Sequence, residues 1–421
     1  MTRKREKYST EITQKNFGGK MKLLSAVCNS FDKVAERKKS KLLQSFASFK
    51  SNHPGTLIEY HQLLLFLCAY PQSKNILTLA KKELQRVATV TKEIFEGKNE
   101  RLREQLVNTG IANTQINASF SFHLVKWLQA AFTDDVELFS IDADDATVEQ
   151  VLYACLPPIE RDIIADKMLK SMKMIRYLKG KEQSELEFLV RLFNSAEIPG
   201  EAKDVLWDSL KVFIAWKVNT GAPSLTQGRS PSGRIFFHKG PLLKIFDWKK
   251  VIQEPIKSAR KLNDEEKSKL ITVGRGVLAM SLRETDPVTY ANEEEVTLFD
   301  MGRGVGVVLY PMIPERRLPL ETYIGYMAFK NSVPVAYGGG WIFLHRSKIG
   351  VNVFPAFRGG ESAFLFCRIL SAYHHHYSVK KFIVEPYQIG KNNMEGLKSG
   401  AFWFYYRLGF VPENETLKAL S

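Results

Sequence analysis

The spacing of apolar and polar residues divides the chain into a helical first half and a mixed second half. Apolar residues recur every three or four positions from Leu23 to Phe49, which predicts one amphipathic helix. Its apolar face fits packing against the next helices or, alternatively, docking on a membrane surface. Pro54-Gly55 ends the pattern, and Thr56 is expected to cap a helix that reaches Tyr70. Further helices are predicted up to Gly97 and over 101–107, 120–132, 148–156, 159–178, 186–193 and 202–216.

After Trp248 the pattern becomes mixed. Asn263 and Glu266 have the spacing of a capping box, which predicts a helix reaching Leu282. Asn331-Ser332 predicts a turn between strands, and three glycines over 338–340 indicate a bulge or a close backbone approach. Strands are predicted over 296–299, 305–310, 322–329, 333–337, 341–344, 348–353 and 381–385. The fold class expected is α+β, an N-terminal all-α helical region followed by a C-terminal mixed α/β sandwich.

A length of 421 residues suits two or three domains. We expect a flexible basic tail over 1–20, an α-helical domain over 21–218, a loop over 219–249 and a C-terminal domain over 250–421. The loop is rich in Gly, Pro and Ser with basic residues among them. It fits either a mobile linker or a segment that closes over a phosphate-bearing ligand.

One stretch of the C-terminal domain has the order strand, basic glycine-rich turn and helix. Alternation up to Val353 predicts the strand, Arg358-Gly359-Gly360 forms the turn, and apolar residues at helical spacing follow Ala363. The start of a helix presents unpaired backbone N–H groups and the positive end of the helix dipole. An anion, most often a phosphate, is the natural occupant of such a place.

This stretch resembles the acyl-CoA-binding segment of the GNAT superfamily of N-acyltransferases. The family pattern Val-x-Pro-x-Tyr-Arg-Gly-x-Gly-x-Gly/Ala is matched at Val353, Pro355, Phe357, Arg358, Gly359 and Ala363. A second family signature, Ala-x-x-x-Tyr-x-x-x-Gly-Phe, is matched at Ala401, Tyr405, Gly409 and Phe410. The resemblance covers the C-terminal domain and implies transfer of an acyl group, by default acetyl, from acetyl-CoA or another acyl-CoA to an amine. The acceptor is then a small molecule or a protein.

One residue departs from the family pattern. Glu361 stands where the family has its middle glycine. A carboxylate at a helix N-terminus is favoured by the dipole by about 0.3–1 kcal/mol. It therefore either occupies the anion site itself or repels a pyrophosphate; alternatively, it points away and only caps the helix.

The resemblance also implies roles for particular residues. Backbone groups of Arg358, Gly359, Gly360, Glu361, Ser362 and Ala363 would hold the CoA phosphates. The N–H of Val353 would polarise the acyl carbonyl, and Tyr405 would return a proton to the leaving thiolate or else be a core aromatic residue. Glu385 and His345 are the candidate bases. No metal site is expected, because His374-His375-His376 point in different directions on a helix and have no carboxylate nearby.

Charge is unevenly distributed along the chain. The formal net charge is +15, and residues 1–50 contain 13 Lys and Arg against 4 Asp and Glu. This basic arm fits contact with RNA, DNA or an anionic surface, or simply a solvated segment. The apolar run from Leu63 to Tyr70 is too short to cross a bilayer, and no secretory signal is recognised. Four widely spaced cysteines form no metal pattern and suggest reduced core thiols in a cytoplasmic protein.

Two further hypotheses compete with a CoA-dependent enzyme. A transferase that uses another donor, such as an aminoacyl-tRNA, would explain both Glu361 and the basic arm. A binding or scaffold protein with a GNAT-like fold and no turnover would explain Glu361 alone. Fold does not identify the substrate, and the sequence leaves the acceptor open.

Overall fold

A computed structural model describes residues 17–47, 53–165, 171–219, 221, 223–231 and 233–413 of the chain. Most of the tail predicted over 1–20 therefore lies outside the described residues. The fold is mixed α+β: the N-terminal part is mostly helical, and a six-stranded sheet lies in the C-terminal part.

The chain divides into two compact units, whose borders differ from the predicted domains. Unit 1 is Met1–Val87, Gly228–Gly274 and Thr285–Ser421, and unit 2 is Ala88–Gln227 and Arg275–Glu284. The helical domain predicted over 21–218 is thus split between the units, and most of the predicted loop over 219–249 belongs to unit 1. Local hydrophobic patterning identifies elements but not their packing partners, which is why these borders were not predicted.

The sheet of unit 1 has the strand order β4-β5-β6-β7-β8-β9, and all neighbouring pairs are antiparallel except β8 and β9. The two strands predicted over 333–337 and 341–344 form one long strand, β7. The close approach expected at its glycines is confirmed, because a Cβ on Gly338 would lie 2.5 Å from the hydroxyl of Tyr326. The strand bounds are β4 Thr297–Asp300, β5 Val305–Pro311, β6 Thr322–Lys330, β7 Val333–Phe343, β8 Arg346–Val353 and β9 Lys381–Ile383.

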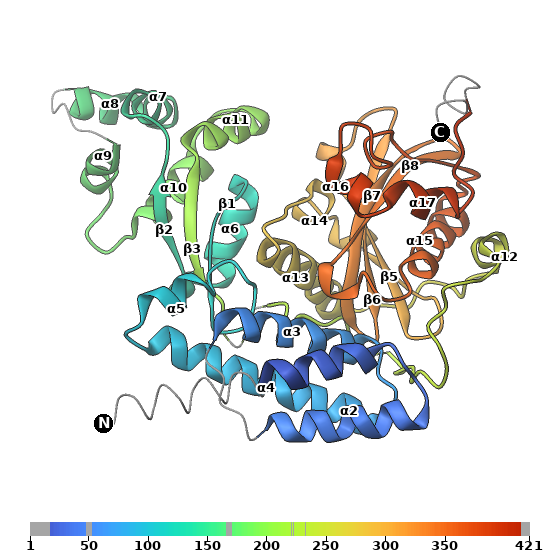
Figure 1. Cartoon of the computed structure of the whole chain (residues 1–421). Coiled ribbons are helices and arrows are strands. Elements are labelled where there is room, and N and C mark those ends of the chain that lie inside the picture. Colours follow the sequence, from blue (N-terminus) through green and yellow to red (C-terminus); the bar gives the residue numbers. More distant parts are fainter. Residues whose placement is uncertain are drawn as a thin grey trace, which may run out of the picture. The chain divides into compact units, whose positions relative to one another are not determined.

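Helices cover both faces of this sheet (Figure 1). α15 (Ser362–Tyr377) lies on one face, where the Tyr373 hydroxyl donates to the Ile324 carbonyl at 2.6 Å. On the other face are α14 (Asp286–Thr289) and the first part of α13 (Asp264–Met280), where the Tyr310 hydroxyl donates to the Leu270 carbonyl. The predicted capping box of α13 is confirmed by both of its hydrogen bonds. Short helices complete this part: α12 Trp248–Gln253, α16 Met394–Lys398 and α17 Ala401–Tyr406.

The single amphipathic helix predicted from Leu23 to Phe49 is in fact two helices. Residues 17–28 are helical, and α2 (Lys33–Phe46) begins after Asp32, whose carboxylate caps it by accepting two backbone N–H groups. Its apolar face packs against the next helices, as one of the two interpretations expected: the rings of Phe46 and Tyr60 lie 4.6 Å apart. α3 (Pro54–Ala69) and α4 (Lys74–Glu96) follow. The capping role predicted for Thr56 is wrong, because α3 begins earlier, at Pro54, where the fixed φ of proline suits the first helical position.

The described residues of the 228–247 segment form neither helix nor strand, yet they pack closely against the rest of unit 1. The side chain of Asn331 accepts from the Phe236 N–H at 2.7 Å and donates to the Phe236 carbonyl at 3.1 Å. The backbone N–H of His238 donates to the Pro71 carbonyl at 2.9 Å. These bonds fix the segment against the turn between β6 and β7 and against the connection between α3 and α4, which does not fit the mobile-linker interpretation.

Unit 2 contains a sheet that the helical prediction missed. Its three antiparallel strands have the order β1-β3-β2. The helix predicted over 202–216 ends at Leu210, because Lys211 adopts a left-handed conformation with φ of 50°, and a strand follows. The strands are β1 Gln115–Ser119, β2 Val136–Ile141 and β3 Val212–Lys217. The helices are α5 Glu100–Glu104, α6 Phe122–Ala131, α7 Asp145–Cys155, α8 Pro158–Ala165, α9 Ser171–Leu178, α10 Glu185–Ser195 and α11 Gly200–Leu210.

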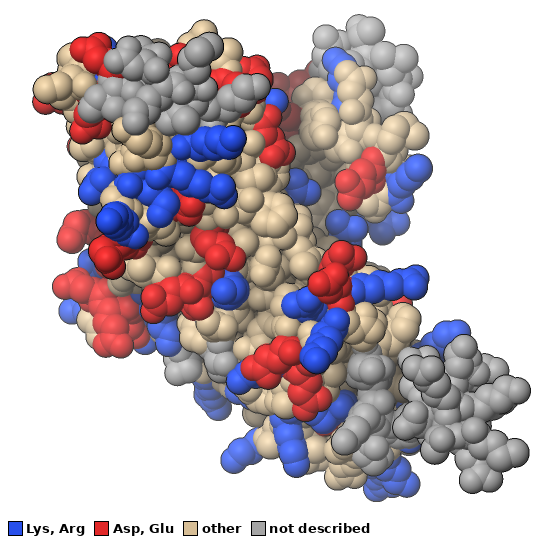
Figure 2. Space-filling model, turned by 90° about the vertical axis from the view of Figure 1, so that its left-hand side faces the viewer, with Lys and Arg blue, Asp and Glu red and all other residues tan. Residues whose placement is uncertain are grey.

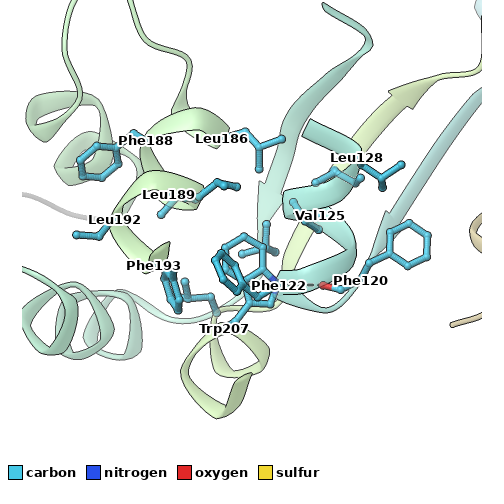
Figure 3. Packing of buried hydrophobic residues seen from close by; sticks show 14 of the residues in the cluster. Phe120, Phe122, Val125, Leu128, Leu186, Phe188, Leu189, Leu192, Phe193 and Trp207 are labelled. Carbon is cyan, nitrogen blue, oxygen red and sulfur yellow. Dashed lines mark hydrogen bonds between the residues drawn. The ribbon is translucent and has the colours of Figure 1, made fainter. Parts of the chain in front are cut away.

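The core of unit 2 is aromatic and aliphatic (Figure 3). The rings of Phe193 and Trp207 meet edge to face at 5.1 Å, and Phe122 lies 5.4 Å from Trp207. The indole N–H of Trp207 donates to the Phe120 carbonyl at 2.9 Å, which satisfies the polar atom of a fully buried ring.

Charge and cysteine placement bear on the expected partners. On the face shown in Figure 2, Lys and Arg are interspersed with Asp and Glu. Lys39, in the basic arm, is fully buried and donates to the Ser30 carbonyl at 2.6 Å, so it serves packing.

All four cysteines are free and buried, as predicted. Within the described ranges, no helix has both the length and the apolar character needed to cross a bilayer.

Candidate functional site

The strand, turn and helix predicted around residue 358 are present at the edge of the unit 1 sheet. β8 ends at Val353, residues Pro355–Phe357 form one 3-10 turn, and α15 begins at Ser362. The Gly360 N–H closes the turn by donating to the Phe357 carbonyl at 2.8 Å. Gly360 is buried, and a Cβ there would lie 2.4 Å from the Tyr70 hydroxyl, so this glycine is required by the approach of α3.

Glu361, the residue that departs from the family pattern, is fully buried and belongs to an ion cluster. Its carboxylate accepts from Lys330 Nζ at 2.8 Å, from Arg303 at 2.7 Å and from the Leu243 N–H at 2.9 Å. It makes no capping bond to α15, so the capping interpretation is wrong. The carboxylate does not occupy the helix N–H groups either, because its hydrogen-bond partners among the described residues all come from other segments.

The ion cluster around Glu361 carries a net positive charge. Burial alone would raise the pKa of Glu361, but the charge and hydrogen bond of Lys330, with the bonds from Leu243 and Arg303, lower that pKa to about 2. Burial lowers the pKa of Lys330 to about 8, against the opposing effect of Glu361. At neutral pH one carboxylate therefore faces two cations, and it presents no net negative charge to a ligand at the turn.

Sequence reasoning missed the residues that surround Glu361. Lys330 ends β6, Arg303 lies in a turn between two glycines, and the Tyr70 hydroxyl accepts the Glu361 N–H at 3.2 Å. Lys244 donates Nζ to the carbonyls of Gly359 and Gly360. Apart from Arg303, which stands between Gly302 and Gly304, no local pattern in the sequence points to these residues, because their relation to Glu361 is entirely long-range.

The first N–H groups of α15 stay available. The first helical bond joins the Leu365 N–H to the Glu361 carbonyl at 2.9 Å. Among the described residues, the N–H groups of Ser362, Ala363 and Phe364 have no acceptor, and the Ser362 hydroxyl is buried without a partner. Such groups at the positive end of a sixteen-residue helix attract an anion.

The flanking residues of the turn are more exposed. Arg358 is exposed and lies 3.8 Å from the carboxylate of Glu395. Gly359 is also exposed and borders a cavity of about 440 Å³. The residues around this cavity come from the turn, from the helix over 17–28 and from α3; they include Pro355, Ala356, Gly359, Lys22, Asn29 and Glu59.

β8 and β9 pair over only three residues and then separate. The last pair joins Lys348 to Ile383, and no residue beyond it is paired in this ladder. The Val351 N–H instead meets the Tyr405 hydroxyl at 3.4 Å. The Phe354 N–H bonds the Val335 carbonyl on the β7 side. Because backbone N–H groups alternate along a strand, the N–H of Val353 points to the same open side as that of Val351, and it has no partner among the described residues.

Tyr405, proposed from the sequence to donate a proton, lies at this opening. Its hydroxyl donates to Gln388 Oε1 at 2.8 Å, and it is buried against the ring of Phe366 at 5.7 Å. Burial raises the pKa of Tyr405 to about 12, although the hydrogen bond from Val351 opposes the shift. Gln388, which the sequence did not single out, also approaches Gly350 so closely that a Cβ there would overlap its amide.

The two predicted bases fall in different places. Glu385 lies two residues beyond Ile383, where the strands separate, and its exposed carboxylate is 2.8 Å from Lys348 Nζ. His345 lies in the turn before β8, and its ring bonds the Ser378 carbonyl. Eight residues of β8 separate this turn from the Val353 end, or about 26 Å at 3.3 Å per residue. The structure thus brings Tyr405 to the backbone of Val351, two residues before Val353. Glu385 contacts Lys348, five residues before Val353, and His345 lies at the other end of the strand.

The comparisons with known proteins give no relative. No protein-family model, no curated protein and no solved structure matches the chain. No group of three or more metal-ligating side chains lies together in the described part of the chain. The geometry of unit 1 is therefore the basis for a functional conclusion.

Proposed function

We propose that unit 1 is an N-acyltransferase of the GNAT type that transfers an acyl group, by default acetyl, from acyl-CoA to an amine. The observation that carries the proposal is the separation of β8 from β9 beside the free N–H groups of α15. An antiparallel run of strands, then a helix, then a parallel strand at the edge agrees with the sequence resemblance.

The residues at the turn fit the diphosphate of CoA. The N–H groups of Ser362, Ala363 and Phe364 supply donors, and the exposed guanidinium of Arg358 adds positive charge. The objection raised by Glu361 is removed, because Lys330 and Arg303 neutralise its carboxylate. The hypothesis of another donor, such as an aminoacyl-tRNA, was based on Glu361 and on the basic arm. It therefore loses the support of Glu361.

The chemistry can be assigned to groups at the opening. The amine nitrogen attacks the thioester carbonyl carbon, the carbon–sulfur bond breaks, and the products are an amide and a thiol. The Val353 N–H would stabilise the negative charge that develops on the carbonyl oxygen. Tyr405, with a pKa of about 12, carries its proton at neutral pH and would give it to the departing sulfur once its bond to Gln388 is released. Glu385 would accept the proton that the amine loses.

Calorimetry with CoA and acetyl-CoA tests donor binding. We expect saturable binding by the full chain, and loss of at least about tenfold in affinity in Gly359→Asp, because a carboxylate then stands at the anion site. Gly359→Asn is the matched control of the same shape, and the position tolerates both because the nearest atom to an added Cβ is 3.6 Å away. Failure of both ligands to bind at millimolar concentration would rule out the proposal.

Turnover is tested by release of free thiol from acetyl-CoA with a panel of amines that includes polyamines, free lysine and peptides. Tyr405→Phe removes only the hydroxyl and should lower kcat by about 10²-fold or more with little change in CoA affinity. Tyr406→Phe on the same helix is the control, because that side chain is 48% exposed. Equal rates in the two variants would remove Tyr405 from the mechanism.

A non-catalytic binding protein of the same fold is the second candidate. It is favoured by the bonds that hold the Tyr405 hydroxyl between Val351 and Gln388. Saturable CoA binding without thiol release from any amine would support this candidate over the enzyme.

A further inference from the structure

Unit 2 has a groove of its own, and we propose that it binds a small phosphate ester that also carries a hydroxyl or amino donor. The groove lies between α6 and α10 and has a volume of about 740 Å³. This value falls in the range of small-molecule sites, roughly 300–1,000 Å³. The inference rests on unit 2 alone and is independent of the function proposed for unit 1.

The two helices present regular polar stripes to the groove. Lys126, Gln129 and Ala130 line it from α6, at positions three and four apart. α10 contributes Glu187, Val190, Arg191 and Asn194, at positions three, four and seven apart. The connection Gly180–Gln183 also lines the groove.

The apolar core holds these helices in place from behind. Val125 and Leu128 of α6, with Leu189 and Phe193 of α10, are buried in the cluster seen in Figure 3. Since the inner faces of the helices are fixed by packing, the backbone positions from which the groove side chains project are fixed as well.

Three cations line the groove: Lys126, Lys181 and Arg191. None of them forms an ion pair with another described residue. Lys126 Nζ is positioned by a hydrogen bond of 2.5 Å to Asn194 Oδ1. The guanidinium of Arg191 offers a planar set of donors that matches two phosphate oxygens at once. An anionic ligand is therefore favoured, and phosphate is the anion that best uses this combination.

The acceptors of the groove define the rest of the ligand. Glu187 is committed to the start of its own helix, where it accepts the Ser184 N–H at 2.7 Å in a capping box. Gln183 Oε1 is buried and has no hydrogen-bond donor among the described residues. A buried acceptor without a partner costs free energy, so a ligand that brings an O–H or N–H is favoured. Glu182, the second carboxylate of the groove, selects against ligands that carry only negative groups.

Calorimetry on the full chain with defined probes tests this site. The probes are ribose 5-phosphate, AMP, inorganic phosphate and a single-stranded oligonucleotide. We expect saturable binding of ribose 5-phosphate or AMP below about 1 mM, with inorganic phosphate weaker because it lacks the sugar hydroxyls that would donate to Gln183 Oε1. In Arg191→Gln the affinity should fall by about tenfold or more.

The controls keep the result interpretable. Arg101→Gln removes an exposed charge of unit 2 outside the groove and should leave affinity within about twofold, since it makes no contact with the groove. Gln183→Leu should weaken ribose 5-phosphate more than inorganic phosphate, because only the sugar brings a donor to that atom. Unchanged circular dichroism of the variants confirms that they fold.

Two outcomes would overturn the proposal. One is the absence of binding by both phosphate esters at millimolar concentration, or binding that Arg191→Gln leaves unchanged. The other is binding of the oligonucleotide alone, which would assign the groove to a nucleic-acid backbone. Neither result depends on CoA binding by unit 1, so this inference and the proposed acyltransferase can fail separately.

Discussion

The two units bury clusters of opposite chemistry. At the centre of the candidate site in unit 1, Glu361 and Lys330 are both fully buried and Arg303 completes the ion cluster. Unit 2 is instead built around a core of apolar residues, among them the rings of Phe193 and Trp207. An apolar cluster tolerates changes that preserve volume, whereas a buried charge requires its particular partner. The comparison indicates that unit 1 holds three distant segments together through specific pairs, while unit 2 relies on packing.

Among the substitutions in unit 1, Glu361→Gln should have the largest effect on stability. The substitution preserves shape but leaves the charge of Lys330 without its carboxylate, and breaking a buried pair costs about 3–5 kcal/mol. Hydrogen exchange resolved by segment, with urea unfolding, would show the loss in unit 1. Glu385→Gln is the control, because its exposed pair with Lys348 is worth about 1 kcal/mol or less. Equal effects of the two variants would show that the cluster is not structural.

Acid should weaken unit 1 through the same residue. The folded pKa of Glu361, about 2, lies below the unfolded value of about 4.3. Its stabilisation is therefore complete above the unfolded value and is lost as pH falls toward 2. The urea midpoint of the wild type should decline over this interval, and Glu361→Gln should decline less steeply. Parallel declines in the two proteins would contradict the assignment.

The adjacent glycines of the turn should respond differently to alanine. A Cβ on Gly360 would lie 2.4 Å from the buried hydroxyl of Tyr70, so Gly360→Ala should cost about 1–3 kcal/mol through overpacking. Gly359→Ala meets only Asn29 at 3.6 Å and should change stability by about 0.5 kcal/mol or less. Thermal unfolding of both variants measures the difference. A larger loss of stability in Gly359→Ala than in Gly360→Ala would contradict the close contact between Gly360 and the Tyr70 hydroxyl.

Phe193→Leu in unit 2 should have the smallest effect of the core substitutions. Leu is smaller than Phe and lacks its ring, so the change leaves a partial cavity and removes the edge-to-face contact with Trp207, at a cost of about 1–2 kcal/mol. Phe193→Ala is the matched comparison and should cost about 3–5 kcal/mol, since it leaves a cavity beside Trp207. Urea unfolding measures both. A cost of Phe193→Leu that exceeds that of Glu361→Gln would reverse the contrast between the units.

The sequence by itself determined most elements of unit 1. Alternation with turn residues predicted the strands from 296 to 353, because one period-two pattern and well-placed Gly and Asn residues agree there. The strand, turn and helix around Arg358 were predicted for the same reason. In unit 2, the run Val212–Lys217 follows a helical pattern without a Gly or Pro break, and a short apolar run does not distinguish helix from strand.

Only the tertiary structure decided what Glu361 does. Its partners Lys330, Arg303 and Leu243 lie 31, 58 and 118 residues away in the chain, and Tyr70 lies 291 residues away. The sequence showed a carboxylate at a helix start, for which the dipole alone favours capping. The charges that face it from other segments are stronger than that local effect, because burial removes the water that would screen them. Local residues thus specify elements, while the state of a buried charge depends on which distant segments meet.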